Sequence, residues 1–171
     1  MSDLENYANF WTHGVDTIIE YPERAQRIQH AGWGTLVEQY SGDGDNWFHF
    51  PLHSPTQVTA YASSSSRREY VSRTALLGGA RFKARLNNNA RIIELHVRAG
   101  EQIVRANLVN IPGARDVDEW IDVRTPDGLS HRLYLVEQVG LVLCVRVEFS
   151  GIDSVGQVIF FGAGAYYLNT I

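Results

Sequence analysis

The sequence predicts an all-β fold, a single-domain antiparallel β-sandwich of jelly-roll type with about ten strands. The first observation is an alternation of side chains, clearest over residues 141–149, where apolar residues occupy every second position. Successive side chains of a strand point to opposite faces, so one face of this strand lies on a core. The second observation is that turn signals recur about every 8–12 residues, with no helical segments between them. Long one-sided alternation favours two antiparallel sheets packed face to face.

The predicted strands follow one another along the chain with short breaks. Residues 1–14 show no clean periodicity and are expected to form an irregular N-terminal segment. Residues 23–30 suit a helical turn or a loop, and residues 117–123 suit either a strand or the start of a short helix. The remaining strands are expected at 15–21, 34–40, 47–52, 57–62, 70–77, 81–86, 91–99, 102–109, 129–136, 141–149 and 157–169.

Glycine, proline and small polar residues mark the ends of these strands. The run 41–46 is a strong turn signal, and Pro51 indicates that its strand ends there or lies at a sheet edge. Four serines and two arginines at 63–68 are expected to form a flexible connector inside the domain. Gly162 and Gly164 interrupt the last strand, which indicates a bulge or the close approach of another backbone.

Size and composition set the broad class of the protein. The 171 residues suffice for one domain, and no apolar run approaches the ~20 residues that span a bilayer, so no membrane partner is expected. The N-terminus lacks the basic and apolar regions of a secretory signal, which predicts a cytoplasmic protein unless a signal has been removed. The single cysteine, Cys144, excludes an intramolecular disulfide and is expected to be a small buried hydrophobe.

Charge is distributed unevenly along the chain. The net charge is −4, but residues 67–105 carry three acidic residues and nine Lys or Arg. Within this segment basic residues alternate with apolar ones, which predicts a basic sheet face made by Arg67, Arg68, Arg81, Lys83 and Arg85. Such a face suits a polyanion or an acidic protein surface, including that of a second copy, and the alternative is a solvated outer face. Because the whole chain is acidic, nucleic acid is not the expected partner.

Two histidines lie in an aromatic stretch. His49 and His53 flank Pro51, with Trp47 beside them. In an ideal strand the two histidines share a face about 13 Å apart, too far for one metal ion unless the proline kinks the chain. The pattern suggests a ligand-binding or general-base site, and the alternative is an aromatic core edge with hydrogen-bonded histidines.

Ten of the nineteen aromatic residues precede residue 62, which favours core burial, with an exposed platform for sugar rings as the alternative. Trp33 lies between Gly32 and Gly34 and is the best exposed candidate in this set. In the turn that follows, Asp43 and Asp45 offer oxygen ligands for calcium, although EF-hand spacing is absent and an ordinary acidic turn is the alternative. No other cofactor and no other metal site is expected.

Four acidic residues later in the chain are a further group of carboxylates, at Asp116, Asp118, Glu119 and Asp122. Two of them could pair as in glycoside cleavage, and the alternative is a solvated acidic loop.

The C-terminal third carries a resemblance. Residues 140–149 and 158–165, together with the Gly-Trp-Gly at 32–34 and residues 46–51, resemble a family of small bacterial β-sandwich proteins of unknown function. The resemblance implies a jelly-roll-like sandwich and carries over no catalytic residue.

The sequence leaves three functions open. The first is a non-catalytic β-sandwich that binds a glycan or a protein partner, and the chain contains no nucleophile elbow, P-loop or dinucleotide motif. The second is a small lyase or hydrolase with a histidine and carboxylate site. The third is a structural subunit that assembles with copies of itself, and a homo-oligomer is also compatible with the first.

Overall fold

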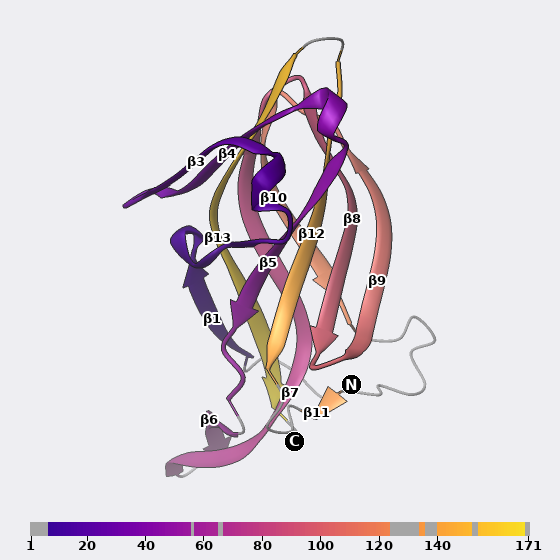
Figure 1. The fold of residues 1–171 in the computed structure, drawn as a ribbon. Coiled ribbons are helices and arrows are strands. Elements are labelled where there is room, and N and C mark those ends of the chain that lie inside the picture. Colours follow the sequence, from indigo (N-terminus) through magenta and orange to yellow (C-terminus); the bar gives the residue numbers. More distant parts are fainter. Residues whose placement is uncertain are drawn as a thin grey trace.

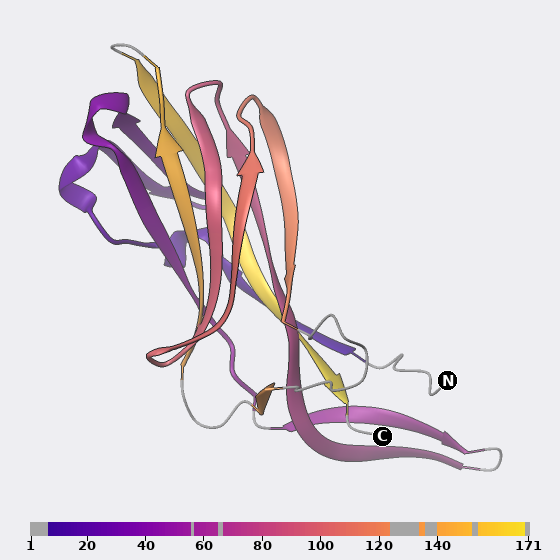
Figure 2. The same ribbon diagram turned by 90° about the vertical axis from the view of Figure 1, so that its right-hand side faces the viewer.

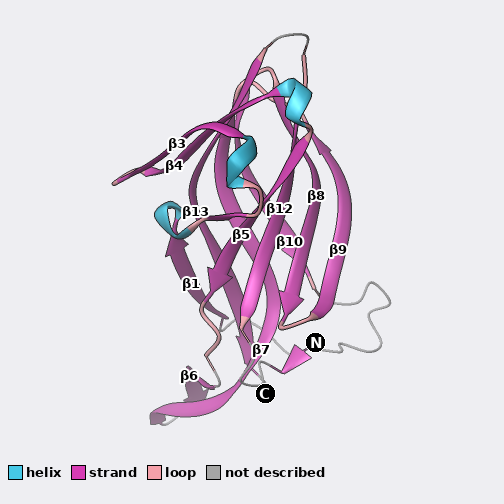
Figure 3. Cartoon of the chain, viewed as in Figure 1, coloured by secondary structure: helices cyan, strands magenta, loops and turns pink. Residues whose placement is uncertain are grey.

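A computed structural model describes residues 7–55, 57–64, 67–123, 134–135, 140–151 and 154–169. These residues form two antiparallel sheets made of thirteen strands, with three single 3-10 turns and no α-helix in the described part of the chain. Figures 1 and 3 show the two sheets as layers of long strands lying over one another. The predicted all-β sandwich is confirmed. None of the described helical turns is long and apolar enough to cross a membrane.

The larger sheet, called sheet A, has eight strands built around the last strand of the chain. Its main path is β10 (Arg115–Asp122), β7 (Arg67–Leu86), β13 (Val155–Asn169), β4 (Gly34–Tyr40) and β3 (Ala25–Ala31). The strand β1 (Tyr7–His13) pairs with β13, while β6 (Gln57–Ser64) and β11 (Tyr134–Leu135) pair with β7. Every one of these pairings is antiparallel.

The smaller sheet, called sheet B, has five strands in the order β2 (Ile18–Ile19), β5 (Asp45–Leu52), β12 (Leu141–Phe149), β8 (Ala90–Ala99) and β9 (Gln102–Ile111). Its central strand β12 has the bounds that the alternating pattern predicts. Because β5 and β8 hydrogen-bond to its two edges, β12 is the spine of sheet B.

The core lies between the inner faces of the two sheets. Phe160 of β13 packs against Phe48 and Phe50 of β5, with ring centroids 4.9 and 5.0 Å apart, and all three rings are fully buried. Alternate residues of β12 and β7 complete the same cluster. The period-two pattern of the sequence therefore reports the inner faces of both sheets.

The N-terminal predictions are partly wrong. Residues 7–13 are the strand β1, not an irregular segment, and residues 15–21 hold the turn η1 (Gly14–Asp16) and the short strand β2. Residues 22–31 form the turn η2 (Pro22–Arg24) and then β3. Both missed strands lie at a sheet edge, where β1 pairs with β13 and β3 pairs with β4. Few of their described side chains are buried, so the sequence shows no clear alternation there.

The predicted flexible connector at 63–68 is also wrong in its described part. Ser64 pairs with Arg67 across a hairpin, and the strand that follows continues without a break to Leu86 through Gly78 and Gly79. Figure 2 shows the β6–β7 hairpin extending beyond the sandwich. Residues 117–123 resolve as the strand β10 rather than a helix. Most of the predicted strand 129–136 lies outside the described residues.

The glycines of the last strand behave as predicted. The pairing of β13 with β7 shifts register between Phe160 and Gly162, which is a bulge. A Cβ atom at Gly164 would lie 2.6 Å from the backbone oxygen of Phe10, so β1 approaches β13 more closely than a side chain allows. The bulge and the close approach of a neighbouring backbone therefore both occur in this glycine-containing part of β13.

Candidate functional site

The outer face of sheet B carries the predicted residues Trp47 and His49. Across this face His49, Cys144 and His96 lie in one row on three neighbouring strands. The Trp47 ring stacks on His49, with centroids 6.5 Å apart and planes 8° apart, and lies 4.8 Å from the His96 ring. Because β12 separates β5 from β8, the indole has to lie across β12 to reach His96. We call Trp47, His49, His96 and Arg146 the sheet B cluster.

Cys144 is buried beneath this cluster although it belongs to the outer face, and its residual exposure is 2%. Burial raises the pKa of its thiol to about 11. A neutral, covered thiol is neither a nucleophile nor a metal ligand. Among the described residues, no group of three or more His, Cys, Asp or Glu side chains is placed to hold a metal ion.

The thiol of Cys144 is expected to be unreactive in the folded protein. With a pKa of about 11, it should react with a disulfide reagent at pH 8 about a hundredfold or more slowly than in denaturant. Absorbance of the released chromophore measures both rates. Equal rates in buffer and in denaturant would show that the cysteine is exposed.

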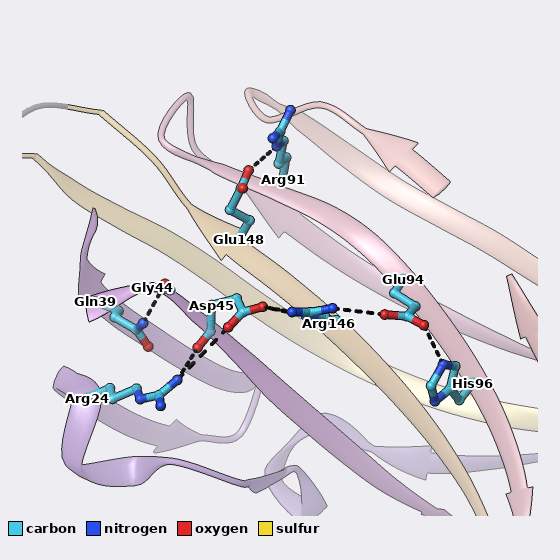
Figure 4. Close-up of polar contacts among 9 residues, drawn as sticks. All are labelled: Arg24, Gln39, Gly44, Asp45, Arg91, Glu94, His96, Arg146 and Glu148. Carbon is cyan, nitrogen blue, oxygen red and sulfur yellow. Dashed lines mark hydrogen bonds and ion pairs between the residues drawn. The ribbon is translucent and has the colours of Figure 1, made fainter. Parts of the chain in front are cut away.

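A chain of charged groups crosses sheet B beside the cluster, as Figure 4 shows. Arg146 donates to Asp45 on one side and to Glu94 on the other, where its Nη1 lies 3.1 Å from Oε2. Glu94 also bonds the Nε2 of His96 at 2.7 Å, and Arg24 donates to the Asp45 backbone oxygen at 2.8 Å. The side chain of Arg146 is therefore held on two sides, with its guanidinium 5.7 Å from the Trp47 ring.

Two further contacts in the same view fix the ends of the strands. Arg91 donates to Glu148 between β8 and β12, and Gln39 donates to the Gly44 backbone oxygen at 3.0 Å. The Arg91–Glu148 pair is an exposed cross-strand ion pair, which solvent screens strongly. The two contacts orient the strands around the cluster more than they stabilise the fold.

Glu94 titrates below its ordinary range. Burial alone would raise the pKa of Glu94, but the hydrogen bonds from His96 and Arg146 outweigh burial and lower it. A carboxyl group whose pKa is lower in the folded protein contributes stability above its unfolded pKa of about 4.3. That contribution disappears as the pH falls through the folded-state pKa.

Replacing Glu94 by glutamine should therefore destabilise the protein in a pH-dependent way. We expect Glu94→Gln to cost about 1 kcal/mol of unfolding free energy at pH 7, where both charge-assisted bonds are lost. The difference from wild type should shrink below pH 4 and vanish at the acid end. Denaturant unfolding at a series of pH values measures it, and a constant difference from pH 7 to pH 3 would contradict the assignment.

The two histidines that flank Pro51 are not brought together, although Trp47 stacks on His49. His49 bonds Glu20 at 3.1 Å on the outer face of sheet B. His53 follows β5 and lies beside Phe10, with ring centroids 6.1 Å apart. The contacts of the two histidines have no residue in common, so the kink that a shared metal site requires does not form.

Trp33 and the acidic turn lie elsewhere. Trp33 occupies the tip of the β3–β4 hairpin with 44% of its surface exposed, as its glycine neighbours predict. Asp43 belongs to the turn η3 (Ser41–Asp43), and the Asp45 carboxylate accepts from Arg146. An arginine at Asp45 competes with calcium for the same oxygens, and calcium binding at this turn stays a prediction.

The predicted basic face lies on the outside of sheet A, where β10 supplies the opposite charge. Arg81 donates to both carboxylate oxygens of Asp118, and Arg85 pairs with Asp116 at 2.5 Å. Hydrogen bonds from these two arginines hold the pKa of each partner carboxyl below its usual range. Arg67 and Arg68 lie in β7 at the hairpin end, and their side chains are outside the described residues.

These ion pairs alter the interpretation of both sequence features. The β10 acids lie on a strand and not in a loop, and two of them neutralise arginines of the basic face. The acidic surface expected from a partner is thus supplied by the same chain, which leaves less charge for a polyanion.

Two tryptophans that sequence reasoning did not select lie in the middle of the same face. Trp120, Arg81, Gly164 and Trp11 form one row across β10, β7, β13 and β1. The two indoles are 46% and 44% exposed. The Arg81 guanidinium lies between them, 4.5 Å from the Trp120 ring and 5.7 Å from the Trp11 ring.

Glycines allow aromatic rings to lie flat on this face. A Cβ atom at Gly164 would be 3.0 Å from the Trp11 ring, so the indole occupies the space above the glycine. Tyr166 lies in the same way over Gly78 and Gly79, where added Cβ atoms would be 2.2 and 2.6 Å from its ring. Trp120 meets Tyr166 edge to face at 5.3 Å.

We call Trp11, Arg81, Trp120 and Tyr166 the aromatic platform. In the sequence the platform is indicated only by glycines inside β7 and β13, at 78–79 and at 162 and 164. Which aromatic rings cover these glycines depends on strand pairing, which the sequence does not show. Asp118 borders the platform on β10 and Asn9 lies beside Tyr166 on β1. The platform is therefore an apolar surface edged by hydrogen-bonding groups.

No protein-family model matches the chain, and no curated protein matches it. A carbohydrate-binding module, TmCBM61 in complex with β-1,4-galactotriose, is similar at 14% identity and a TM-score of 0.38, over 98% of this chain and 90% of that one. A family two carbohydrate esterase from Cellvibrio japonicus is similar at 7% identity and a TM-score of 0.38. That match covers 96% of this chain and 35% of the esterase. Similarity at this level carries no information about function.

Proposed function

We propose that this protein binds carbohydrate on the aromatic platform of sheet A. The observation that carries the proposal is the row in which Trp120 and Trp11, both nearly half exposed, flank Arg81 on the outer face of sheet A. Exposed indoles offer rigid apolar faces with a polar N–H at the edge, and the C–H faces of sugar rings stack on such surfaces. The two indoles are not needed to fill the core, which lies on the other face of sheet A. Exposed apolar side chains that lie together commonly mark a binding surface.

The polar groups around the indoles suit a ligand with many hydroxyl groups. Arg81 is held by two hydrogen bonds to Asp118, so its guanidinium keeps one position between the rings. Binding sites of small ligands combine apolar area with a few fixed polar groups of this kind. Because the ion pair exists before the ligand arrives, little side-chain entropy is lost on binding.

The platform favours binding over catalysis. The described histidine and carboxylate pairs, His49 with Glu20 and His96 with Glu94, lie on sheet B and not beside the exposed indoles. The only thiol of the chain is buried on sheet B. The protein-partner and self-assembly alternatives remain predictions, and light scattering at micromolar concentration tests self-assembly.

A glycan array tests the proposal. Wild-type protein is expected to bind one or more polysaccharides, and the double variant Trp11→Ala/Trp120→Ala is expected to bind none of them. Thermal melting of both proteins verifies that the variant is folded. Binding that survives in the folded double variant, or the absence of any glycan binding by wild type, would overturn the assignment.

A further inference from the structure

Beside the Trp11 ring of the aromatic platform, positive charges outnumber negative ones. Two cations, Arg81 and Lys83, each lie 5.7 Å from the Trp11 ring. One carboxylate, Asp118, serves both of them, and Arg81 engages both of its oxygens. Lys83 Nζ is 3.7 Å from Asp118 Oδ2, beyond hydrogen-bond distance, and the lysine side chain is 49% exposed. The ammonium of Lys83 therefore has donors directed to solvent.

The strands on the far side of Lys83 contribute no carboxylate to these rows. Gly162, which pairs with Lys83, faces His13 on β1, and Gly164 faces Trp11. The next row pairs Tyr166 with Asn9. The described acids of this face are Asp116, Asp118 and Asp122 on β10, with Asp122 in the Tyr166 row, and Glu38 on β4, which accepts from Gln157 and pairs with Arg27. Of the two cations beside the Trp11 ring, Lys83 is the one whose partner carboxylate is already engaged by the other, so a ligand over Trp11 meets an ammonium with free donors.

We propose that the glycan bound by the platform carries carboxylates, as uronic acid units do, and that Lys83 selects them. This inference rests on the proposed carbohydrate binding and adds the class of ligand. A uronate ring stacked on Trp11 would place its carboxylate within reach of the ammonium of Lys83. Charge-assisted hydrogen bonds are about twice as strong as neutral ones, so a single lysine is sufficient to discriminate.

The test uses pairs of polysaccharides that differ only in charge. One pair is polygalacturonate and its fully methyl-esterified form, and the other is glucuronoxylan and carboxyl-reduced glucuronoxylan. Wild type is expected to bind at least one acidic member about tenfold or more tightly than its neutral counterpart. This preference should weaken as salt is raised, because the interacting charges are exposed.

Variants assign the preference to one residue. Lys83→Gln is expected to remove the preference for the acidic member and to leave binding of the neutral one unchanged, and Lys83→Arg is expected to retain the preference. The control Arg91→Gln makes the same charge change on sheet B, where Arg91 pairs with Glu148, and is expected to bind as wild type. Thermal melting establishes that all variants are folded.

The outcomes separate this inference from the proposed function. Equal binding of acidic and neutral members overturns the selection of uronates and leaves carbohydrate binding intact. A preference that persists in Lys83→Gln overturns the role of Lys83. Failure to bind either pair and every glycan of the array overturns both proposals.

Discussion

Replacing Trp11 by alanine is expected to weaken glycan binding by about thirtyfold, which corresponds to about 2 kcal/mol. The indole lies over Gly162 and Gly164 and is 44% exposed, so alanine removes nearly half of a tryptophan's surface from contact with the ligand. A large aromatic anchor near the centre of an interface commonly costs this much when it is truncated. Isothermal titration with the best array ligand gives the affinity directly.

The matched control is Trp33→Ala. Trp33 has the same exposed fraction, 44%, but it occupies the tip of the β3–β4 hairpin and does not belong to the row of Trp11, Arg81 and Trp120. Its removal is expected to leave the affinity within twofold of wild type. If instead Trp33→Ala abolishes binding and Trp11→Ala does not, the site lies at the hairpin tip and the platform is not the binding surface.

The largest expected effect on stability comes from Phe160. Its ring is fully buried and lies between the sheets, against Phe48 and Phe50. Phe160→Ala removes this contact and leaves a cavity, at a cost of about 3–5 kcal/mol. Denaturant unfolding followed by tryptophan fluorescence measures the loss, which is a large fraction of the stability of a domain of this size.

The neighbouring Phe161 provides the control. It is half-buried, lies at the bulge of β13, and its ring is 5.6 Å from the Arg85 guanidinium on the outer face. Phe161→Ala deletes the same atoms and is expected to cost less than half as much as Phe160→Ala. Similar losses for the two variants would mean that the inner and outer faces of β13 are assigned wrongly.

Local patterns predicted the parts of the fold that are buried on one face. The alternation over 141–149 predicted the bounds of β12, and Gly162 and Gly164 predicted the bulge. The strands β1 and β3 were missed, because a strand at a sheet edge or in a projecting hairpin buries too few side chains to produce a period of two.

The candidate sites divide in the same way. The exposure of Trp33 and the burial of Cys144 followed from immediate neighbours in the chain. The neutralisation of Arg81 by Asp118 did not, since the two residues are 37 positions apart and meet only when β7 pairs with β10. The same pairing of β7 with β10 distinguishes the members of the predicted basic face. Arg81 and Arg85 are hydrogen-bonded to carboxylates, whereas Lys83 is less restrained.

Side-chain alternation within single strands was enough to predict the fold class, the inner faces of most strands and the position of Cys144 in the most regular strand. That Trp11, Arg81 and Trp120 lie side by side is visible only once the strands are paired. Their row crosses strands from residues 7–13, 67–86, 115–122 and 155–169. Register between strands so distant in the chain is set by packing of the whole sandwich, which no local pattern records.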